Sequence, residues 1–162
     1  MKKAVVSLAL MASVLAPSAA LAQKLVFVVR HAERADDPAR DQDNPPLSAA
    51  GAARAAKLRA LLEDAEIRAI YVSQYRRTQD TAAPLAAKLK VKPELVPPNV
   101  SALIEAMRAG HANDNVLIVG HTSTIPAIVK ALTGSSLEMP ESDYGSLIVI
   151  VPATRALTRL RF

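Results

Sequence analysis

Two apolar runs in this sequence lead directly into residues that can do chemistry. Residues 25–29 are rich in valine and run into Arg30 and His31, and a second run, residues 116–119, is followed by His121 after one glycine. Short apolar runs of this kind predict strands buried on both faces. Ligands of open α/β sheets bind beyond the carboxyl ends of such strands. The pattern therefore predicts a site for an anionic group at one edge of a sheet.

The residue types at these positions favour phosphate chemistry. A neutral imidazole such as that of His31 is a nucleophile that can form a covalent intermediate. The planar guanidinium of Arg30 matches the geometry of phosphate oxygens. Arg77 follows another predicted strand and begins a helix, so it can point back over the sheet edge, where the helix N-terminus adds positive charge. Taken singly, each histidine could be a structural imidazole, and Arg76 and Arg77 could both be solvated.

Other kinds of site find little support in the sequence. His111 lies in a turn rich in Gly, Ala and Asn and has no metal-ligand spacing to the other two histidines, so we interpret it as a surface residue. A Gly-x-Ser-x-Gly elbow and the common glycine-rich phosphate loops are missing from the sequence. We therefore expect neither a metal nor a cofactor.

The first 22 residues are typical of a secretory signal peptide. Lys2 and Lys3 precede an uncharged apolar stretch at residues 4–16, and residues 20–22 fit a small-x-small cleavage site. The apolar stretch is shorter than the about 20 residues that span a bilayer. We therefore expect cleavage after Ala22 and a periplasmic or secreted protein.

Composition limits what the remaining chain can do. Removing the predicted leader from the 162 residues leaves 140, the size of one domain with a sizeable core. The formal charge is +5, of which Lys2 and Lys3 contribute two, and aromatic residues make up 3% of the chain, so we expect no nucleic-acid partner. The chain has no cysteine, which excludes disulfides and thiolate chemistry. No second hydrophobic span occurs, so we expect no membrane span in the mature chain; the oligomeric state stays open.

Strand and helix patterns alternate along the chain. This order predicts a three-layer α/β sandwich, a mostly parallel sheet with helices on both faces. We expect Ser48 and Ser101 to cap helices, and Pro84 to kink the second helix or to begin a new one. The predicted helices are 49–62, one around 82–89, 101–109 and 125–132, and the predicted strands are 25–29, 67–73, 91–96, 116–119, 147–151 and an edge strand at 156–162.

Four motifs in a fixed order span almost all of the chain beyond the predicted leader. They are Val29-Arg30-His31-Ala32-Glu33, Pro46-Leu47-Ser48-x-x-Gly51, Ser73-x-x-x-Arg77-x-x-x-Thr81-Ala82 and Val119-Gly120-His121. In this order they resemble the motifs of the histidine phosphatase superfamily, with Ala32 where the commonest pattern has glycine.

The resemblance implies a phosphoglycerate-mutase-like fold over residues 23–162 as a single histidine phosphatase domain. It also implies a phosphate pocket of two arginines and two histidines without a metal. His31 would attack phosphorus and become phosphohistidine, while Arg30, Arg77 and His121 would hold the phosphate oxygens. An acid would then protonate the leaving oxygen and activate water.

The acid is where the sequence departs from the family. Longer members place a glutamate after the third strand, but residues 95–99 hold no carboxylate. We rank Glu33 first, because it is nearest in sequence to the nucleophile, ahead of Glu94 and Glu105. Small phosphohistidine phosphatases of this superfamily also lack an obvious donor.

These considerations predict an exported, metal-independent phosphatase that acts on a small phosphorylated substrate. The short spacing between Arg77 and His121 leaves little room for a substrate-selecting cap, so the site should be open. The alternatives are a phosphatase for phosphohistidine or for envelope phospho-sugars, and a non-catalytic phosphate-binding module that lacks the acid.

Overall fold

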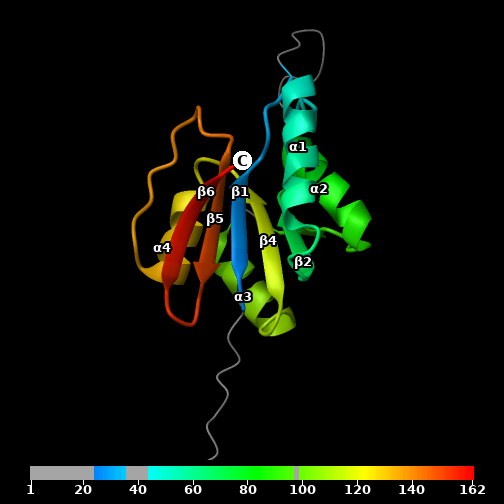
Figure 1. Cartoon of the computed structure of the whole chain (residues 1–162). Coiled ribbons are helices and arrows are strands. Elements are labelled where there is room, and N and C mark those ends of the chain that lie inside the picture. The colour runs from blue at the N-terminus through cyan, green and yellow to red at the C-terminus, as the bar shows by residue number, and fades with distance from the viewer. Residues whose placement is uncertain (1–23, 36–43, 97–98) are drawn as a thin grey trace, which may run out of the picture.

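The computed structural model describes residues 24–35, 44–96 and 99–162. The predicted signal peptide lies outside the described residues, as does most of the predicted loop between residues 35 and 46. Strands and helices alternate along the chain and end in a pair of strands (Figure 1). The elements are β1 Val26–Arg30, α1 Ala49–Leu62, β2 Ile67–Val72, α2 Arg76–Leu89, β3 Glu94–Leu95, α3 Val100–Gly110, β4 Asn115–Gly120, α4 Ile125–Thr133, β5 Ser146–Val151 and β6 Ala156–Arg161.

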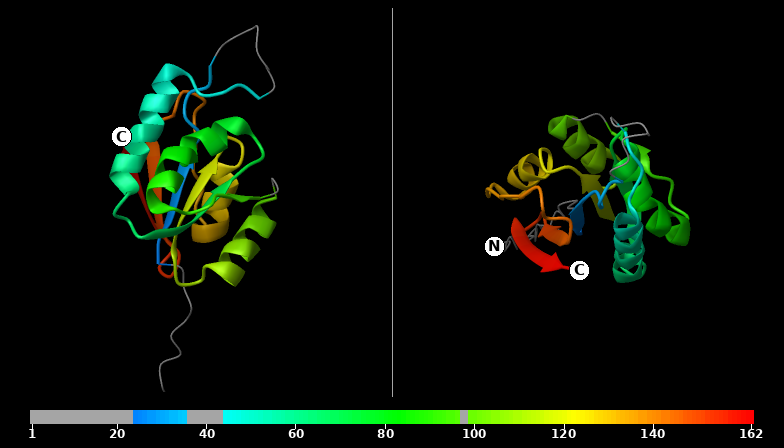
Figure 2. Two further views of the ribbon diagram at one scale, coloured as in Figure 1. Left: turned by 90° about the vertical axis from the view of Figure 1, so that its right-hand side faces the viewer. Right: turned by 90° about the horizontal axis from the view of Figure 1, so that it is seen from above.

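One six-stranded sheet organises the described residues, with strand order β3-β2-β4-β1-β5-β6. The first four strands in this order are parallel, while β5 and β6 are antiparallel to their neighbours. One face packs on α1 and α2 and the other on α3 and α4, which confirms the predicted three-layer architecture (Figure 2). Among the described helices, none is both long enough and apolar enough to cross a lipid bilayer.

The central strands are buried because their side chains alternate between two apolar layers. In β1, Val26 and Val28 face α3 and α4, while Phe27 and Val29 face α1 and α2. All five residues of β1 are buried, as expected for a parallel strand covered on both faces. The edge strand β6 is mostly exposed on one side, in agreement with its prediction as an edge.

The start of α1 follows the predicted pattern. Ser48 caps the helix, since its hydroxyl oxygen accepts a hydrogen bond from the Gly51 amide at 3.1 Å. A Cβ atom at Gly51 would lie 2.1 Å from the carbonyl oxygen of Glu33. Only glycine therefore allows α1 to pack this closely on the chain leaving β1.

One local expectation is wrong, and the structure excludes one of the two alternatives expected at Pro84. The cap of α3 is Asn99 and not Ser101, because the Asn99 side-chain oxygen accepts from the amides of Ser101 at 2.9 Å and Ala102 at 3.5 Å. Pro84 does not begin a helix, since α2 already starts eight residues earlier. The helix continues through Pro84, and Leu85 and Ala86, which follow it, are buried against the sheet.

Candidate active site

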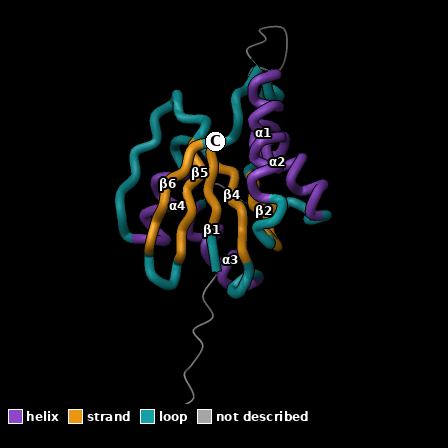
Figure 3. Tube along the Cα trace, viewed as in Figure 1, coloured by secondary structure: helices purple, strands orange, loops and turns teal. Residues whose placement is uncertain are grey.

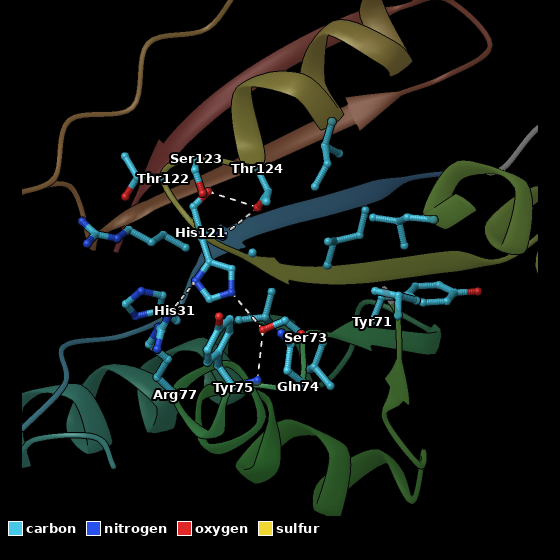
Figure 4. A pocket seen from close by; sticks show the side chains of 18 of the residues that line it. His31, Tyr71, Ser73, Gln74, Tyr75, Arg77, His121, Thr122, Ser123 and Thr124 are labelled. Carbon is cyan, nitrogen blue, oxygen red and sulfur yellow. Dashed lines mark hydrogen bonds between the residues drawn. The ribbon is translucent and has the colours of Figure 1, made fainter. Parts of the chain in front are cut away.

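The pairing of β1 with β4 brings the two predicted histidines together. Arg30 pairs with Gly120 in the parallel register, and the His31 amide donates to the Gly120 carbonyl at 3.0 Å. The next residues along the two strands, His31 and His121, therefore leave the sheet side by side. Their ring centroids lie 5.2 Å apart (Figure 4).

Both histidines line a pocket of about 700 Å³ at this edge of the sheet. Arg30 and Arg77 line the same pocket, so the structure brings together four of the five predicted site residues. Arg34, which the sequence analysis did not select, also lines it. Three arginines around two imidazoles make this end of the pocket suited to an anion.

Arg77 reaches the pocket from the first turn of α2. Its Nη2 atom lies 3.5 Å from His121 Nδ1, and its guanidinium lies 4.2 Å from the centroid of the Tyr75 ring. Arg76 instead pairs with Asp80 at 3.2 Å and does not line the pocket. The structure thus separates the two neighbouring arginines as the second arginine motif predicts.

Hydrogen bonds fix which nitrogen of His31 is free to react. His31 Nδ1 lies 2.8 Å from the Ala32 carbonyl oxygen, which can only accept a hydrogen bond. The proton of a neutral imidazole must therefore sit on Nδ1 and leave a lone pair on Nε2. This tautomer presents a nucleophilic nitrogen.

The peptide that supplies this carbonyl is itself held by α2. The Ala32 amide donates to the Thr81 hydroxyl at 2.9 Å, and that hydroxyl donates to the Arg77 carbonyl at 2.7 Å. Both Ala32 and Thr81 are buried. The second arginine motif therefore also fixes the chain around His31.

His121 is oriented by Ser73, which directly follows β2, and by Arg77 on α2. Its Nε2 atom lies 2.8 Å from the Ser73 hydroxyl, and its Nδ1 faces the Arg77 guanidinium, which can only donate. These contacts place the proton on Nε2, where it is donated to Ser73. Ser73 was part of a predicted motif, but its partner depends on how β2 and β4 pair.

Burial keeps both imidazoles neutral. The pKa of His31 is lowered to about 4, mainly by burial and also by the nearby cations Arg30, Arg77 and Arg34. Burial also lowers the pKa of His121 to about 4, assisted by Arg77. Both rings are therefore uncharged at neutral pH, the form that a nucleophile requires.

Arg30 has an acidic partner that the sequence analysis missed. Its Nη2 donates to the Glu141 carboxylate at 2.7 Å and to the Tyr144 hydroxyl at 3.2 Å, and Nη1 donates to the Glu141 carbonyl. The guanidinium also lies 4.0 Å from the centroid of the Tyr144 ring. Both partners come from the long loop between α4 and β5 (Figure 3), which no periodicity or motif marks in the sequence.

Glu33, the predicted acid, is not brought to the pocket. Its carboxylate pairs with Arg54 of α1, at 2.6 Å from Nη2 and 2.9–3.0 Å from Nε, and it does not line the cavity. Hydrogen bonds from Arg54 lower the pKa of Glu33, the opposite of what a proton donor needs. The structure gives Glu33 a role in holding α1 against the chain after β1. Nor do Glu94 and Glu105 line the pocket.

His111 lies apart from the two other histidines. Its ring contacts Asp114 at 2.9 Å and Glu94 at 3.2 Å, and it is half-buried rather than a free surface residue. The described residues contain no group of three or more His, Cys, Asp or Glu side chains that could hold a metal ion.

The fold and the pocket define an α/β protein with histidines and arginines gathered in one pocket at the carboxyl ends of parallel strands. The sequence model of the histidine phosphatase superfamily (branch 1) matches residues 26–98. No sequence among the curated proteins matches the chain. Over residues 26–98 the chain is therefore similar to the histidine phosphatase superfamily, the family that the four sequence motifs resemble.

Solved structures share the fold at low sequence identity. The protein histidine phosphatase SixA, in complex with tungstate, superposes with a TM-score of 0.66 at 20% identity, covering 84% of this chain and 94% of its own. A phosphoglycerate mutase from Bacillus anthracis gives 0.65 at 16% identity, covering 88% and 94%. A mycobacterial glucosyl-3-phosphoglycerate phosphatase gives 0.62 at 12% identity, covering 86% and 98%. These likenesses support the phosphoglycerate-mutase-like fold.

Proposed function

We propose that this protein is a phosphatase that hydrolyses a phosphomonoester through a phosphohistidine on His31. The observation that carries the proposal is the lone pair on His31 Nε2 in a pocket shared with His121 and two arginines. The pocket can offer four cationic or hydrogen-bonding groups to a phosphoryl group with about −1.5 to −2 charges. The tungstate complex of SixA supports oxyanion binding in this fold.

The proposed reaction has two transfers. The Nε2 lone pair of His31 forms a bond to phosphorus while the bond to the leaving oxygen breaks, and that oxygen takes up a proton. Water then attacks phosphorus, the P–N bond breaks, and its electrons return to His31 as inorganic phosphate forms. Arg30, Arg77 and His121 stabilise the oxygens as charge shifts between them.

A panel of phosphomonoesters tests this proposal. Incubation with 4-nitrophenyl phosphate should release inorganic phosphate, and rapid acid-free denaturation with a labelled substrate should trap phosphate on the protein. A non-catalytic phosphate-binding module would bind phosphate or tungstate but release no phosphate and retain no label.

The proton transfers need a carboxylate, for which we propose Glu141 in place of Glu33. It is the one acidic side chain among the described residues that line the pocket, and its side chain is 80% exposed, so it can move. Because it also binds Arg30, an incoming phosphate must compete with it.

Replacing Glu141 by glutamine should slow substrates with poor leaving groups. General acids contribute roughly 100- to 10,000-fold, so turnover of ethyl phosphate should fall at least about 100-fold, while 4-nitrophenyl phosphate, whose product leaves unaided, should be much less affected. Tungstate should bind more tightly, because a competing charge is gone. Glu138→Gln, an exposed carboxylate in the same loop, is the control. Equal losses on both substrates would contradict the proposed role.

We also propose that the protein is exported, on the basis of the leader-like residues 1–22. Mass spectrometry of protein recovered from the cell envelope should find an N-terminus at Gln23, and recovery of an intact Met1 there would contradict it.

A further inference from the structure

The pocket extends well beyond its phosphate-binding end, and this extension is apolar. Figure 4 shows His31, His121 and Arg77 gathered at one end and Tyr71 at the other. We refer to the extension as the apolar arm. It is lined by Val96, Val100, Leu103, Ile118 and Ile128, which lie on the face of the sheet that α3 and α4 cover.

We propose that the apolar arm binds the leaving group, so that the substrates are phosphomonoesters of apolar alkyl or aryl alcohols rather than phospho-sugars or phosphoglycerates. This inference rests on the proposed function and names the substrate class of the same site.

Three elements of the fold build the walls of the arm. Ile118 comes from β4 and is 2% exposed, Leu103 comes from α3 and is 4% exposed, and Ile128 comes from α4 and is 2% exposed. Val100, at the start of α3, is half-buried. Leu103, Ile118 and Ile128 belong to the core on this face of the sheet and expose little surface, so the half-buried Val96 and Val100 packed against them provide most of the accessible apolar wall. Such a surface gains free energy when an apolar group displaces water from it.

The charges of the pocket lie at its other end. Arg30, Arg34 and Arg77 line the pocket together with the nucleophile His31, and their charges lower its pKa. Glu141 is bound to Arg30 at the same end. Among the described residues of the arm no cation remains to pair with a second acidic group of a substrate, such as the carboxylate of a phosphoglycerate.

Two polar groups near the arm are already used within the protein, whereas the buried Tyr71 hydroxyl has no hydrogen-bond partner among the described residues. The Asn99 side-chain oxygen caps α3. The Thr124 hydroxyl accepts from the His121 amide at 3.0 Å and donates to the carbonyl of the same residue at 3.2 Å. A sugar carries more hydroxyls than this one free group could pair with, and each hydroxyl buried without a partner costs about 1–3 kcal/mol.

A series of alkyl phosphates tests the inference, because ethyl, butyl and hexyl phosphates have leaving groups of equal reactivity. We expect kcat/KM to rise roughly threefold to fourfold for each methylene that enters the arm. Glycerol phosphate, similar in size to butyl phosphate, should be a much poorer substrate than butyl phosphate. A flat series, or a preference for glycerol phosphate, would overturn the inference while leaving the proposed function intact.

Binding of phosphonates tests the apolar arm independently of whether the protein is a phosphatase. If no phosphomonoester were hydrolysed, the proposed function would fail, but calorimetry with methylphosphonate and butylphosphonate would still test the arm. Butylphosphonate should bind at least about tenfold more tightly, and equal affinities would overturn the inference.

An isosteric substitution tests whether the preference for longer alkyl phosphates arises in the apolar arm. Val100→Thr places a hydroxyl in the arm and should reduce the ratio of kcat/KM for hexyl over ethyl phosphate by at least about threefold. The matched control is Val91→Thr, because Val91 is half-buried but packs on the opposite face of the sheet and does not line the pocket. An unchanged ratio in the Val100→Thr protein, or an equal change in the control, would overturn the assignment.

Discussion

Replacing His31 by alanine is expected to abolish both phosphate release and covalent labelling of the protein. The variant loses the nitrogen lone pair that the hydrogen bond to the Ala32 carbonyl exposes, and no other group in the described pocket has an equivalent position. Removing the nucleophile of a hydrolase can cost on the order of 10⁶-fold in kcat, so we expect a loss of more than about 10⁴-fold. Phosphate release and label retention are the two measurements.

The matched control for this variant is His111→Ala. His111 lies outside the pocket and contacts Glu94 and Asp114, so its removal should leave labelling intact. Circular dichroism and thermal melting would show whether either variant has lost its fold. Label that persists in a folded His31→Ala protein would overturn the proposed nucleophile, and label that disappears only in the His111 variant would move it elsewhere.

The site residues that lie at the ends of strands could be predicted from the sequence. Arg30, His31 and His121 each follow an apolar run, and runs of this kind form parallel strands whose carboxyl ends meet at one edge. The register of β1 on β4 then places the histidines together without any further information. Arg77 could be predicted because a motif fixes its distance from β2.

The loop after α4 could not be predicted in the same way. Glu141 and Tyr144 are attached to no strand or helix, and their contacts with Arg30 depend on the path of a loop across the sheet edge. Glu33 was selected for its closeness in sequence to His31, but the chain turns after β1 and delivers its carboxylate to Arg54 on α1. Distance along the chain does not determine distance in space once a loop has turned.

Replacing Arg77 by alanine is expected to weaken oxyanion binding and to slow turnover about 100- to 1000-fold, the usual cost of removing one donor to a developing negative charge. Arg77 lines the pocket beside His121, and burial and Arg34 lower its pKa because this region is crowded with cations. A bound oxyanion would relieve that crowding, so tungstate or vanadate affinity should fall together with kcat/KM. Calorimetry and phosphate-release kinetics measure the two effects.

Arg76→Ala is the matched control, because the two arginines are adjacent and both lie in the first turn of α2. Arg76 is 59% exposed and pairs with Asp80 across one helical turn, a contact that contributes only about 0.3–0.5 kcal/mol to stability. Its removal should therefore change binding and turnover little. Arg77→Lys should restore activity only in part, since an ammonium cannot form the paired hydrogen bonds of a guanidinium. A greater loss in Arg76→Ala than in Arg77→Ala would show that the anion lies on the other side of α2, and full activity in both variants would remove Arg77 from the site.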